Sequence, residues 1–487
     1  MISFNAIPAD IRVPGQYIEF DASRAVSGLP PIRNRVLLIG QRLAAGSAAA
    51  LTIQPIVAPA QAIAKFGRGS MLARMAAAYK KADSFSEVHA IALDDAGGGI
   101  AASGTITVTG PATVAATIAL MIAGVSVPVV VATGDIASVI ATKIAAAITT
   151  RPDLPVTAAA VAAVVTLTAR NKGTIGNAID LRHSHFAGEA LPAGVALAIV
   201  AMATGAGDPD ISTIWAAIGD NSYRTIVIGL TDATTLASAR TELDSRWGPL
   251  RMLESVAYGA KSGTQGTLAA FGAALNSELI SVLGTGKSPS WPCEAAAIYG
   301  AVCGYYSAID PARPLHTLSL TGLVAPKETE RFTRTERDLL LRDGIATFTI
   351  DQAGTARIER AITTYQTDSL GIDDLAWLDL ESVTTLGYLR ASLRLRIATK
   401  FPRHKLADDG TAFGPGQAVV TPKILRAEII ALAREWETAA LVEGLDQFVA
   451  DLIVERDASD PNRVNALIPP DIVNQFRSFA AAVQFRL

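Results

Sequence analysis

The hydrophobic and polar positions of this chain follow two spacings, one typical of strands and one typical of helices. Short apolar runs at 36–40 (VLLIG) and 88–93 (VHAIAL) predict buried strands, and the segment from Met71 to Lys81 between them has a helical pattern. This order predicts a strand–helix–strand unit. The same texture returns in a strand at 225–230, a helix near 233–244 and a strand at 252–258, so we expect an α/β core.

The segment between these two regions has a different pattern of residues. Its runs at 105–109, 118–131 and 155–169 are poor in charge and rich in β-branched residues, which predicts paired strands. One helix is expected among them, capped by Asp135 and lined on one side by Ile136, Ile140, Ile144 and Ile148. We therefore expect a β-rich domain at 96–207, inserted at a surface loop into a discontinuous α/β core of residues 22–95 and 208–366.

The last part of the chain predicts a C-terminal α+β domain at 367–475. One helical face there carries Leu386, Leu389, Leu393 and Ile397. Thr421 and Pro422 are predicted as the N-cap and first residue of a long amphipathic helix that continues through Phe448. The segment at 460–471 (DPNRVNALIPPD) is expected to be a loop.

Both ends of the chain predict extended arms, at 1–21 and at 476–487. In the closing FAAAVQFRL the apolar side chains recur with a period of two, as in a strand. The opening VPGQYIEFD alternates in the same way, with Tyr17 on the face opposite Gln16, Ile18 and Phe20. The residues alone leave open whether each arm pairs within its own chain or with another copy. The C-terminal residues on one face are Phe479, Ala481, Val483, Phe485 and Leu487.

Composition narrows the classes of partner. The formal net charge of -3 provides no basic surface for nucleic acid and no polybasic segment for anionic lipid. Charged residues make up 18% of the chain, against about 25% in ordinary soluble domains. A surface this poor in charge suits a subunit that packs against copies of itself.

The uncharged stretch at 96–134 is long enough to suggest a membrane span, but Gly124 and Pro128 favour paired strands there. The N-terminal sequence has an early aspartate, Asp10, and lacks the basic head of a secretion signal, so we expect the protein to stay in a cytoplasm.

Candidate chemistry is sparse. GTGKS at 284–288 lacks the first glycine of a phosphate-binding loop, because Ser281 stands at that position. His183 and His185 have no third histidine nearby to complete a metal site, and we expect them to be solvated loop residues. Cys293 and Cys303 are ten residues apart in a helical segment and are expected to be reduced and packed as small apolar groups. No serine lies in a G-x-S-x-G pattern. We predict no catalytic, cofactor-binding or metal-binding residue, and no enzyme.

One stretch concentrates positive charge. It is either a solvated helix face or a docking surface for an acidic protein partner. Its members are Arg390, Arg394, Arg396, Lys400, Arg403, His404 and Lys405.

Three stretches of the chain resemble the tail sheath proteins of contractile-tailed bacteriophages, in their Mu-like branch. They are ISFNAIPADIRVPGQYIEFD with the following NRVLLIGQR, the core stretch RTIVIGLTD, and the closing IPPDIVNQFRSFAAAVQFRL. The likeness extends over nearly the whole chain and rests on the combination and order of these patterns. The segment with VTLTARNKGTIGNAIDL resembles the variable domain that many such sheaths carry outside a common core.

The resemblance implies a subtilisin-like α/β core that serves as architecture and not as a protease. The Gly-Thr-Ser nucleophile pattern of that protease family is missing here, in agreement with this expectation. It also implies stacked hexameric rings that form a helical sleeve around a tail tube, in which the two arms meet on the C-terminal domain of an adjacent subunit.

The partners implied are further copies of this chain, the tail tube protein, and the baseplate and tail terminator proteins. The implied location is the phage tail in the virion, after assembly in the host cytoplasm. Arg390, Arg394, Lys400 and Arg403 are then candidates to face the tube. The sequence leaves two alternatives, another repetitive tail component such as a tube or baseplate subunit, and an α/β hydrolase.

Overall fold

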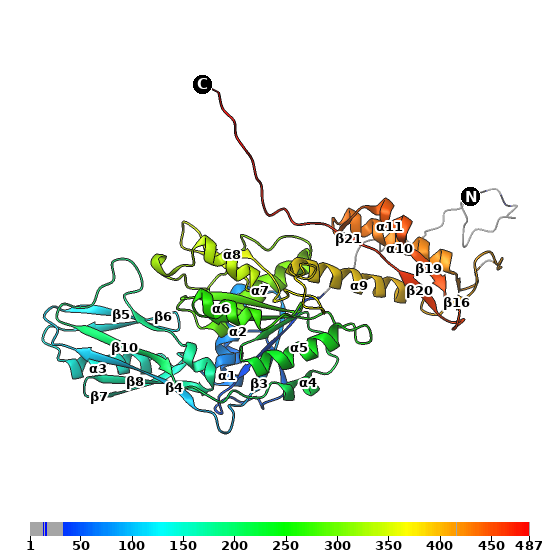
Figure 1. Ribbon diagram of the computed structural model, residues 1–487. Helices are drawn as coiled ribbons and strands as arrows, with labels where there is room; N and C mark the ends of the chain where they lie inside the picture. The colour runs from blue at the N-terminus through cyan, green and yellow to red at the C-terminus, as the bar shows by residue number, and fades with distance from the viewer. Residues whose placement is uncertain (1–12, 14, 17–32, 415, 487) are drawn as a thin grey trace. The chain divides into compact units, whose positions relative to one another are not determined.

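The computed structural model describes residues 13, 15–16, 33–414 and 416–486. These residues form two compact units, one that contains residues 389–473 together with 13 and 15–16, and one of residues 33–388 and 474–486. The longer unit contains an α/β core and a group of antiparallel strands, and the shorter unit mixes helices with short strands (Figure 1). The α/β content predicted from the sequence is confirmed.

A six-stranded sheet forms the centre of the longer unit, in the order β13-β12-β11-β1-β3-β2. Five of these strands run parallel, and β2 pairs antiparallel to β3 at one edge. All four residues of β11 are buried, as expected for a parallel sheet covered on both faces. The strands are β1 (Arg35–Gln41), β2 (Ile53–Ile56), β3 (Glu87–Leu93), β11 (Thr225–Ile228), β12 (Val256–Ser262) and β13 (Ile280–Gly286).

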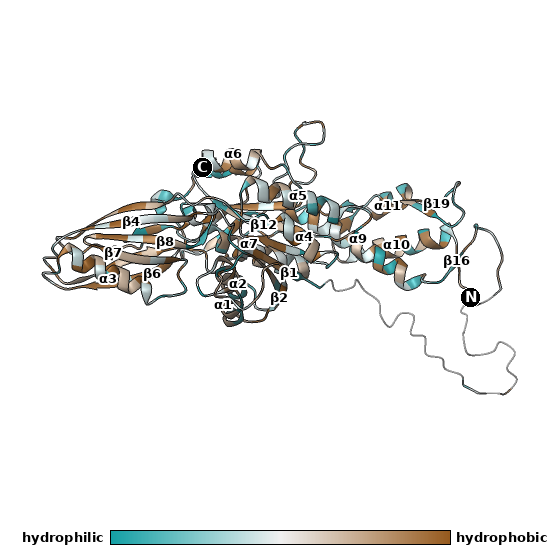
Figure 2. Cartoon of the chain, turned by 90° about the horizontal axis from the view of Figure 1, so that it is seen from below, coloured by the Kyte–Doolittle hydropathy of each residue, from teal (hydrophilic) through white to brown (hydrophobic). Residues whose placement is uncertain are grey.

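Helices cover the two faces of this sheet. The chain crosses from β1 to β3 in one direction and from β11 to β12 in the other, so right-handed crossovers place α2 and α5 on opposite faces. Helix α7 packs against α2 and against β11 and β12, and much of it is coloured as hydrophobic in Figure 2. The helices are α1 (Pro59–Phe66), α2 (Met71–Ala82), α4 (Ser212–Ile218), α5 (Ala233–Trp247), α6 (Gln265–Ala273), α7 (Pro292–Ile309) and α8 (Arg334–Arg342).

Two glycines let α7 lie very close to the sheet. A methyl group on Gly300 would lie 2.7 Å from Val227 Cγ2, and one on Gly304 would lie 2.3 Å from Thr225 Oγ1. Both distances are shorter than van der Waals contact. The one-turn spacing of these glycines therefore sets the separation between α7 and β11.

The β13 edge of the sheet is covered by later parts of the chain. The Ala346 N–H donates to Val282 O at 2.9 Å, and the Thr364 N–H donates to Ile280 O at 2.8 Å. Covering an edge in this way prevents uncontrolled pairing with other chains. A hairpin of β14 (Thr347–Ile350) and β15 (Ala356–Arg360) and the 3-10 helix η3 (Glu328–Glu330) complete the core.

The β-rich segment builds two sheets of its own, in the orders β10-β4-β8-β7 and β6-β5-β9, and α3 packs on both. Figure 1 shows these elements as a separate group beside the core. Ile100 and Ala206, at the two ends of the segment, exchange backbone hydrogen bonds of 2.8 and 3.1 Å. The elements are β4 (Ala101–Thr109), β5 (Ala116–Ile122), β6 (Val125–Val131), α3 (Ala137–Thr149), β7 (Val156–Val161), β8 (Val164–Lys172), η2 (Thr174–Ala178), β9 (Leu181–His183) and β10 (Ala196–Ala203).

The uncharged stretch of this segment forms paired strands, as predicted. Its β5 pairs antiparallel to β6, and its β4 pairs antiparallel to β8 and β10. In the described part of the chain, no helix has the length and apolar character that a membrane crossing requires. The predicted capping role of Asp135 is wrong. Helix α3 has Ile136 at its N-cap, and Asp135 Oδ2 instead accepts a hydrogen bond from the Ala132 N–H at 2.7 Å.

The shorter unit contains most of α9 together with α10, α11 and several short strands. Thr421 caps α10 through a hydrogen bond from the Ile424 N–H, and Pro422 is the first residue of the helix, as predicted. Trp436 is buried in this unit and donates from Nε1 to Ser392 Oγ at 3.0 Å. The elements are α9 (Leu380–Lys400), β16 (Lys405–Leu406), β17 (Val419–Val420), α10 (Pro422–Thr438), β18 (Val442–Glu443), α11 (Leu445–Asp451), β19 (Ile453–Arg456), β20 (Val464–Leu467) and β21 (Asp471–Ile472).

Three sequence predictions need correction here. The helix that starts at Pro422 ends at Thr438 and does not continue through Phe448, because Ala440 and Gly444 have positive φ angles of 54° and 67°. The segment at 460–471 is not only a loop, since it contains β20 and the start of β21. In the core, the strand predicted at 252–258 begins only at Val256.

Candidate functional site

The carboxyl edge of the parallel sheet is the first place to examine, because α/β sheets bind ligands where the strand order reverses. Here this position lies at the ends of β1 and β11. The buried Gln41 side chain donates from Nε2 to Asp95 Oδ1 and to Lys172 O, both at 2.8 Å. Lys172 is the last residue of β8 in the β-rich segment. The end of β8 therefore occupies the usual ligand position.

Asn171 strengthens this closure. Its Oδ1 accepts a hydrogen bond from the Met71 N–H at 2.9 Å, and its Nδ2 donates to Asp95 Oδ1 and Arg42 O, both at 3.0 Å. Free N–H groups at a helix start could bind phosphate. At the start of α2 the first of them is already satisfied by the protein. This edge is thus built as a junction between two parts of the chain and not as a binding crevice.

A cavity of about 330 Å³ lies between α5 and α6, with Asp232, Arg240 and Lys261 among its lining residues. Burial lowers the pKa of Lys261, with Asp232 and Asp208 acting in the opposite direction. The Lys261 ammonium lies 5.2 Å from the centre of the Phe271 ring. The lining contains no serine, cysteine or histidine, so it holds no Ser–His or Cys–His pair of the kind that hydrolases use.

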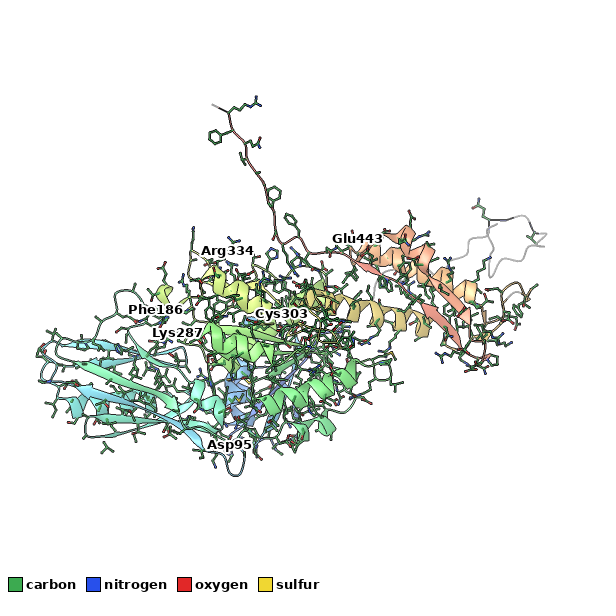
Figure 3. All side chains as sticks on the ribbon, viewed as in Figure 1. Asp95, Phe186, Lys287, Cys303, Arg334 and Glu443 are labelled. Carbon is green, nitrogen blue, oxygen red and sulfur yellow. The ribbon has the colours of Figure 1, made fainter. Side chains whose placement is uncertain are left out.

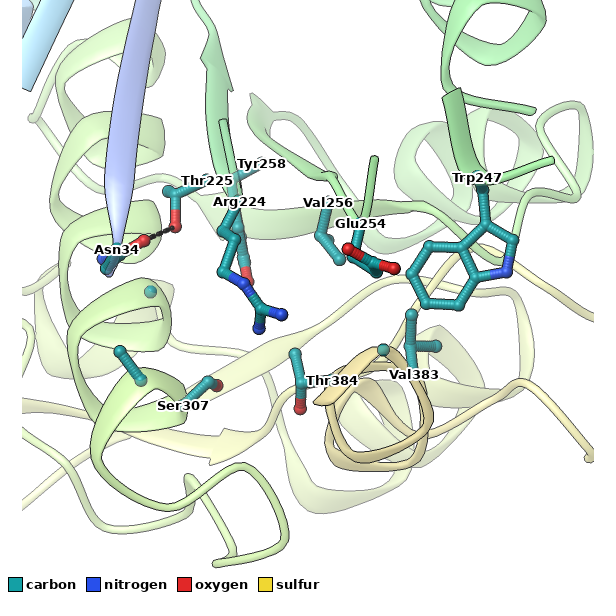
Figure 4. Close-up of a pocket in the computed structure, with 13 residues that line it drawn as sticks. Asn34, Arg224, Thr225, Trp247, Glu254, Val256, Tyr258, Ser307, Val383 and Thr384 are labelled. Atoms are coloured by element: carbon teal, nitrogen blue, oxygen red, sulfur yellow. Dashed lines mark hydrogen bonds between the residues drawn. The ribbon is translucent and has the colours of Figure 1, made fainter. Parts of the chain in front are cut away.

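A second cavity lies at the opposite, amino edge of the sheet, around Arg224, Trp247 and Glu254. Figure 4 shows these side chains between β11, β12 and the first turns of α9. Its volume of about 30 Å³ holds about one water molecule. It is too small for a substrate.

The motifs that suggested chemistry prove to be structural. Gly284 and Gly286 of the GTGKS motif are part of β13, and Ser288 Oγ donates to Val324 O at 2.6 Å. The segment therefore does not form a phosphate-binding loop.

The expectation of solvated loop residues is wrong for both histidines, since His183 is half-buried as the last residue of β9 and His185 is buried. The His185 side chain is only 8% exposed, and its Nε2 lies 3.1 Å from Ala325 O. Burial lowers the pKa of His185, and so does the nearby Arg182 charge. No cluster of three or more metal-ligating side chains occurs within residues 33–414 and 416–486.

Cys293 and Cys303 are free and buried in α7, as expected. Figure 3 places Cys303 among the packed side chains of the core. Burial raises the pKa of both thiols well above the usual value for cysteine, so neither is a reactive thiolate.

The C-terminal segment differs from the rest of the longer unit. Residues 476–486 form no helix or strand, and most of their side chains are exposed (Figure 1). Phe479 is 82% exposed, Val483 86% and Phe485 80%, while Ala481 is also exposed. Leu487 lies outside the described residues. The apolar face predicted from the sequence is thus uncovered in the single chain.

The predicted N-terminal arm is described only in part. Gln16 is exposed, whereas Tyr17, Ile18 and Phe20 lie outside the described residues.

Among the described residues, the short strands of the shorter unit have outer edges without a partner strand. Within the described part of the chain its strands form only pairs, β16 with β17, β18 with β21, and β19 with β20. A two-stranded sheet has unpaired backbone groups on both outer edges, which can accept another strand. Ile453 of β19 and Leu467 of β20 are 52% and 62% exposed beside such edges.

The basic stretch is partly neutralised within the shorter unit. Arg396 forms ion pairs with Glu428 at 3.0 Å and with Glu435, and Lys400 contacts Glu428 at 2.8 Å. Arg394 and Arg403 are exposed, and Arg390 is half-buried.

Sequence reasoning missed a group of charges at the start of α9. Arg477 contacts Asp379 at 2.5 Å and Glu381 at 3.1 Å, although about a hundred residues separate them. Glu381 is buried, and its burial raises the pKa of the carboxyl group, which the Leu315 N–H and the Arg477 charge counteract. No local pattern in the sequence connects these positions.

Two regions of the chain match family descriptions of phage proteins. Residues 204–364 match the phage tail sheath protein central domain, and residues 373–486 match the phage tail sheath C-terminal domain. The Mu-like prophage FluMu tail sheath protein of Haemophilus influenzae is 44% identical over 486 residues, covering 100% of both chains.

Solved structures give weaker similarities. A sheath tail protein from Desulfitobacterium hafniense aligns with a TM-score of 0.48 at 13% identity, covering 94% of this chain and 100% of that one. A sheath tail protein from Listeria innocua aligns with a TM-score of 0.48 at 11% identity, covering 92% and 93%. The helical sheath of the anti-feeding prophage in its contracted state gives 0.47 at 11% identity, covering 98% and 99%.

Proposed function

Because this chain belongs to the tail sheath proteins of Mu-like contractile phages, and is therefore a contractile sheath subunit, we propose that its copies are joined by exchange of their terminal strands. It is a structural component of the phage tail and not an enzyme. Membership of this family argues against the two alternatives left by the sequence, a tube or baseplate subunit and a hydrolase.

The main support for strand exchange is the exposed C-terminal segment. Its apolar residues Phe479, Val483 and Phe485 are more than three-quarters exposed in the single chain. Large apolar patches left open to water mark interaction sites. A strand added to the sheet edge of a neighbour would cover this face and satisfy its backbone groups.

The acceptor we propose is the shorter unit of a neighbouring copy. Among the described residues its two-stranded sheets have unpaired outer edges, and Ile453 and Leu467 supply exposed apolar side chains next to them. The arm at 1–21, with Gln16, Tyr17, Ile18 and Phe20, would add beside the C-terminal strand. About five backbone hydrogen bonds at about 0.5–1.5 kcal/mol each, plus two or three buried side chains, make each link worth several kcal/mol.

The sleeve that follows is a stack of hexameric rings around a tail tube, assembled in the host cytoplasm and finished by baseplate and terminator proteins. Arg390, Arg394, Lys400 and Arg403 are the residues we propose to face the tube. Contraction would be a rigid-body rearrangement of the subunits, with the exchanged strands keeping neighbours connected while the tube passes through the host envelope. The assembled sleeve would hold the required energy in a metastable state.

We keep the finer description of the fold as part of this proposal. It comprises a subtilisin-like core at 22–95 and 208–366, an inserted domain at 96–207, a C-terminal domain at 367–475 and arms at 1–21 and 476–487. The backbone pairing of Ile100 with Ala206 supports the insertion, because it brings the two ends of the inserted segment together.

The test separates the two faces of the C-terminal arm. Deleting residues 479–487 is expected to leave a folded monomer that forms no sheath in electron micrographs. The double variant Val483→Asp/Phe485→Asp should have the same effect, because it puts charge on the face that becomes buried. Gln484→Asp places a charge on the other face and should assemble normally. Normal sheaths from the deletion would refute strand exchange.

A further inference from the structure

The C-terminal segment is held at one residue just before it becomes free. Arg477 Nη1 contacts Asp379 Oδ1 at 2.5 Å, and Nη2 donates to Glu381 Oε2 and to Gln475 Oε1, both at 3.1 Å. Asp379 and Glu381 flank Leu380, the first residue of α9. All of these residues belong to the longer unit.

The acidic partners of Arg477 are themselves fixed by the core. Glu381 Oε1 accepts the Leu315 N–H at 2.9 Å, and the Glu381 side chain is 3% exposed. Asp379 Oδ1 also accepts from Arg360 Nη2 at 2.9 Å, which connects it to β15. Two carboxylates thus face two guanidinium groups, and the charges balance.

This contact differs from an ordinary surface ion pair. Exposed pairs contribute little because water and salt screen them and the side chains lose freedom. Removing Arg477 would leave the buried Glu381 carboxylate without a counter-charge, which is far more costly. The geometry therefore favours a permanent attachment.

The attachment ends abruptly. Two residues after Arg477 the side chain of Phe479 is 82% exposed, and residues 479–486 take part in no described strand pairing. The fixed and the free parts of the segment meet at Arg477.

We infer that Arg477 is the anchor of the C-terminal arm, the point through which a strand donated to a neighbour pulls on the core of its own subunit. This inference rests on the proposed strand exchange and adds the place where the resulting force enters the donor. Force on the arm passes through Asp379 and Glu381 to α9 and, through Arg360, to β15. The residues that make these contacts, Asp379, Glu381 and Arg360, all lie outside residues 389–473.

The anchor also fixes the reach of the arm. The ten residues from 478 to 487 span at most about 33–36 Å when extended. A neighbour's acceptor edge must therefore lie within that distance of Arg477.

Limited trypsin digestion of the free subunit tests the anchor directly. Trypsin must take the arginine side chain into its own pocket, so an anchored Arg477 resists cleavage. The variant Gln484→Arg supplies an exposed reference site in the same segment. In this background we expect cleavage after Arg477 to be at least tenfold slower than after residue 484, as followed by intact mass spectrometry.

Releasing the anchor should remove the protection. Asp379→Asn/Glu381→Gln, added to the Gln484→Arg background, should make both sites equally accessible. Asp351→Asn removes a carboxylate from a different arginine pair, with Arg357, and should leave the protection unchanged. Circular dichroism confirms that each variant is folded. Equal cleavage at both sites in the Gln484→Arg protein itself would overturn the inference.

Two properties of the assembled sheath, its formation and its resistance to urea, distinguish the role of Arg477 as an anchor from strand exchange itself. Asp379→Asn/Glu381→Gln keeps the whole arm, so sheaths should form but dissociate at a lower urea concentration than the wild type. Unchanged resistance to urea would contradict a role in carrying force. If the protein without residues 479–487 still assembled, strand exchange would fail, while the trypsin result would still decide whether Arg477 is fixed.

Discussion

At the scale of single residues, the close approach of α7 to the sheet depends on Gly304. We predict that Gly304→Ala lowers the free energy of unfolding by about 1–3 kcal/mol, because the new methyl group would overlap Thr225 and push α7 away from the sheet. Urea denaturation followed by circular dichroism measures this change.

Gly266 is the matched control for this substitution. It is also helical, in α6, but a methyl group there meets no atom within 4 Å. Gly266→Ala should therefore be neutral or stabilising by up to about 1 kcal/mol, through helix propensity alone. Equal losses for both variants would argue against close packing as the cause.

Single residues were also where sequence reasoning failed most clearly. His185 has a polar neighbourhood in the sequence, yet it is buried against Ala325, 140 residues later. Asp135 stands where an N-cap is expected, but its Oδ2 accepts hydrogen bonds from both the Ala132 N–H and Lys143 Nζ. Both outcomes depend on which of several available partners is reached in three dimensions, and local patterns do not contain that information.

At the scale of elements, Asn171 joins the inserted strands to the core. We predict that Asn171→Ala costs about 2–4 kcal/mol, because it leaves the buried Met71 N–H without its acceptor and Arg42 O without its donor. Hydrogen exchange of the Met71 amide should accelerate specifically.

Asn462→Ala is the control, since this side chain lies in an exposed turn of the shorter unit. It should leave both the overall stability and the exchange of the Met71 amide unchanged. Slow exchange at Met71 in the Asn171→Ala protein would show that another group accepts the Met71 N–H.

Elements with strong periodic patterns were predicted well. Strands β1, β3 and β11 and helices α2 and α5 all lie where apolar runs or helical spacing placed them. The end of α10 was missed because residues 439–443 (AALVE) continue an acceptable helical pattern. What ends the helix is the left-handed backbone at Ala440 and Gly444, followed by the pairing of β18 with β21. A partner strand about thirty residues away cannot be inferred from that pattern.

At the scale of the whole molecule, the two compact units provide a test of independence. Each contains one deeply buried tryptophan with a single hydrogen bond from Nε1, Trp291 to Ile175 O and Trp436 to Ser392 Oγ. We predict that Trp436→Phe costs about 2–4 kcal/mol locally and speeds hydrogen exchange in α10 but not in α7. Trp291→Phe should show the reverse.

If either substitution speeds exchange equally in both helices, the units unfold as one. The comparison needs no dissection of the chain, because both variants are made in the full-length protein.

The candidate site was predictable only in part at this scale. The alternation of Phe479, Val483 and Phe485 indicated a strand that needs a partner, and the structure leaves these side chains uncovered. Some of the strand edges proposed as acceptors could not be predicted, because β18 and β21 are two residues each and carry no recognisable pattern.

The buried cysteines have one further consequence for a particle that waits outside its host. Cys293 is 1% exposed and Cys303 is fully covered, and both keep their protons. Oxidation in air begins at accessible thiolates. We therefore expect that a stored virion needs no reducing agent to prevent disulfide cross-links in its sheath, which would block contraction.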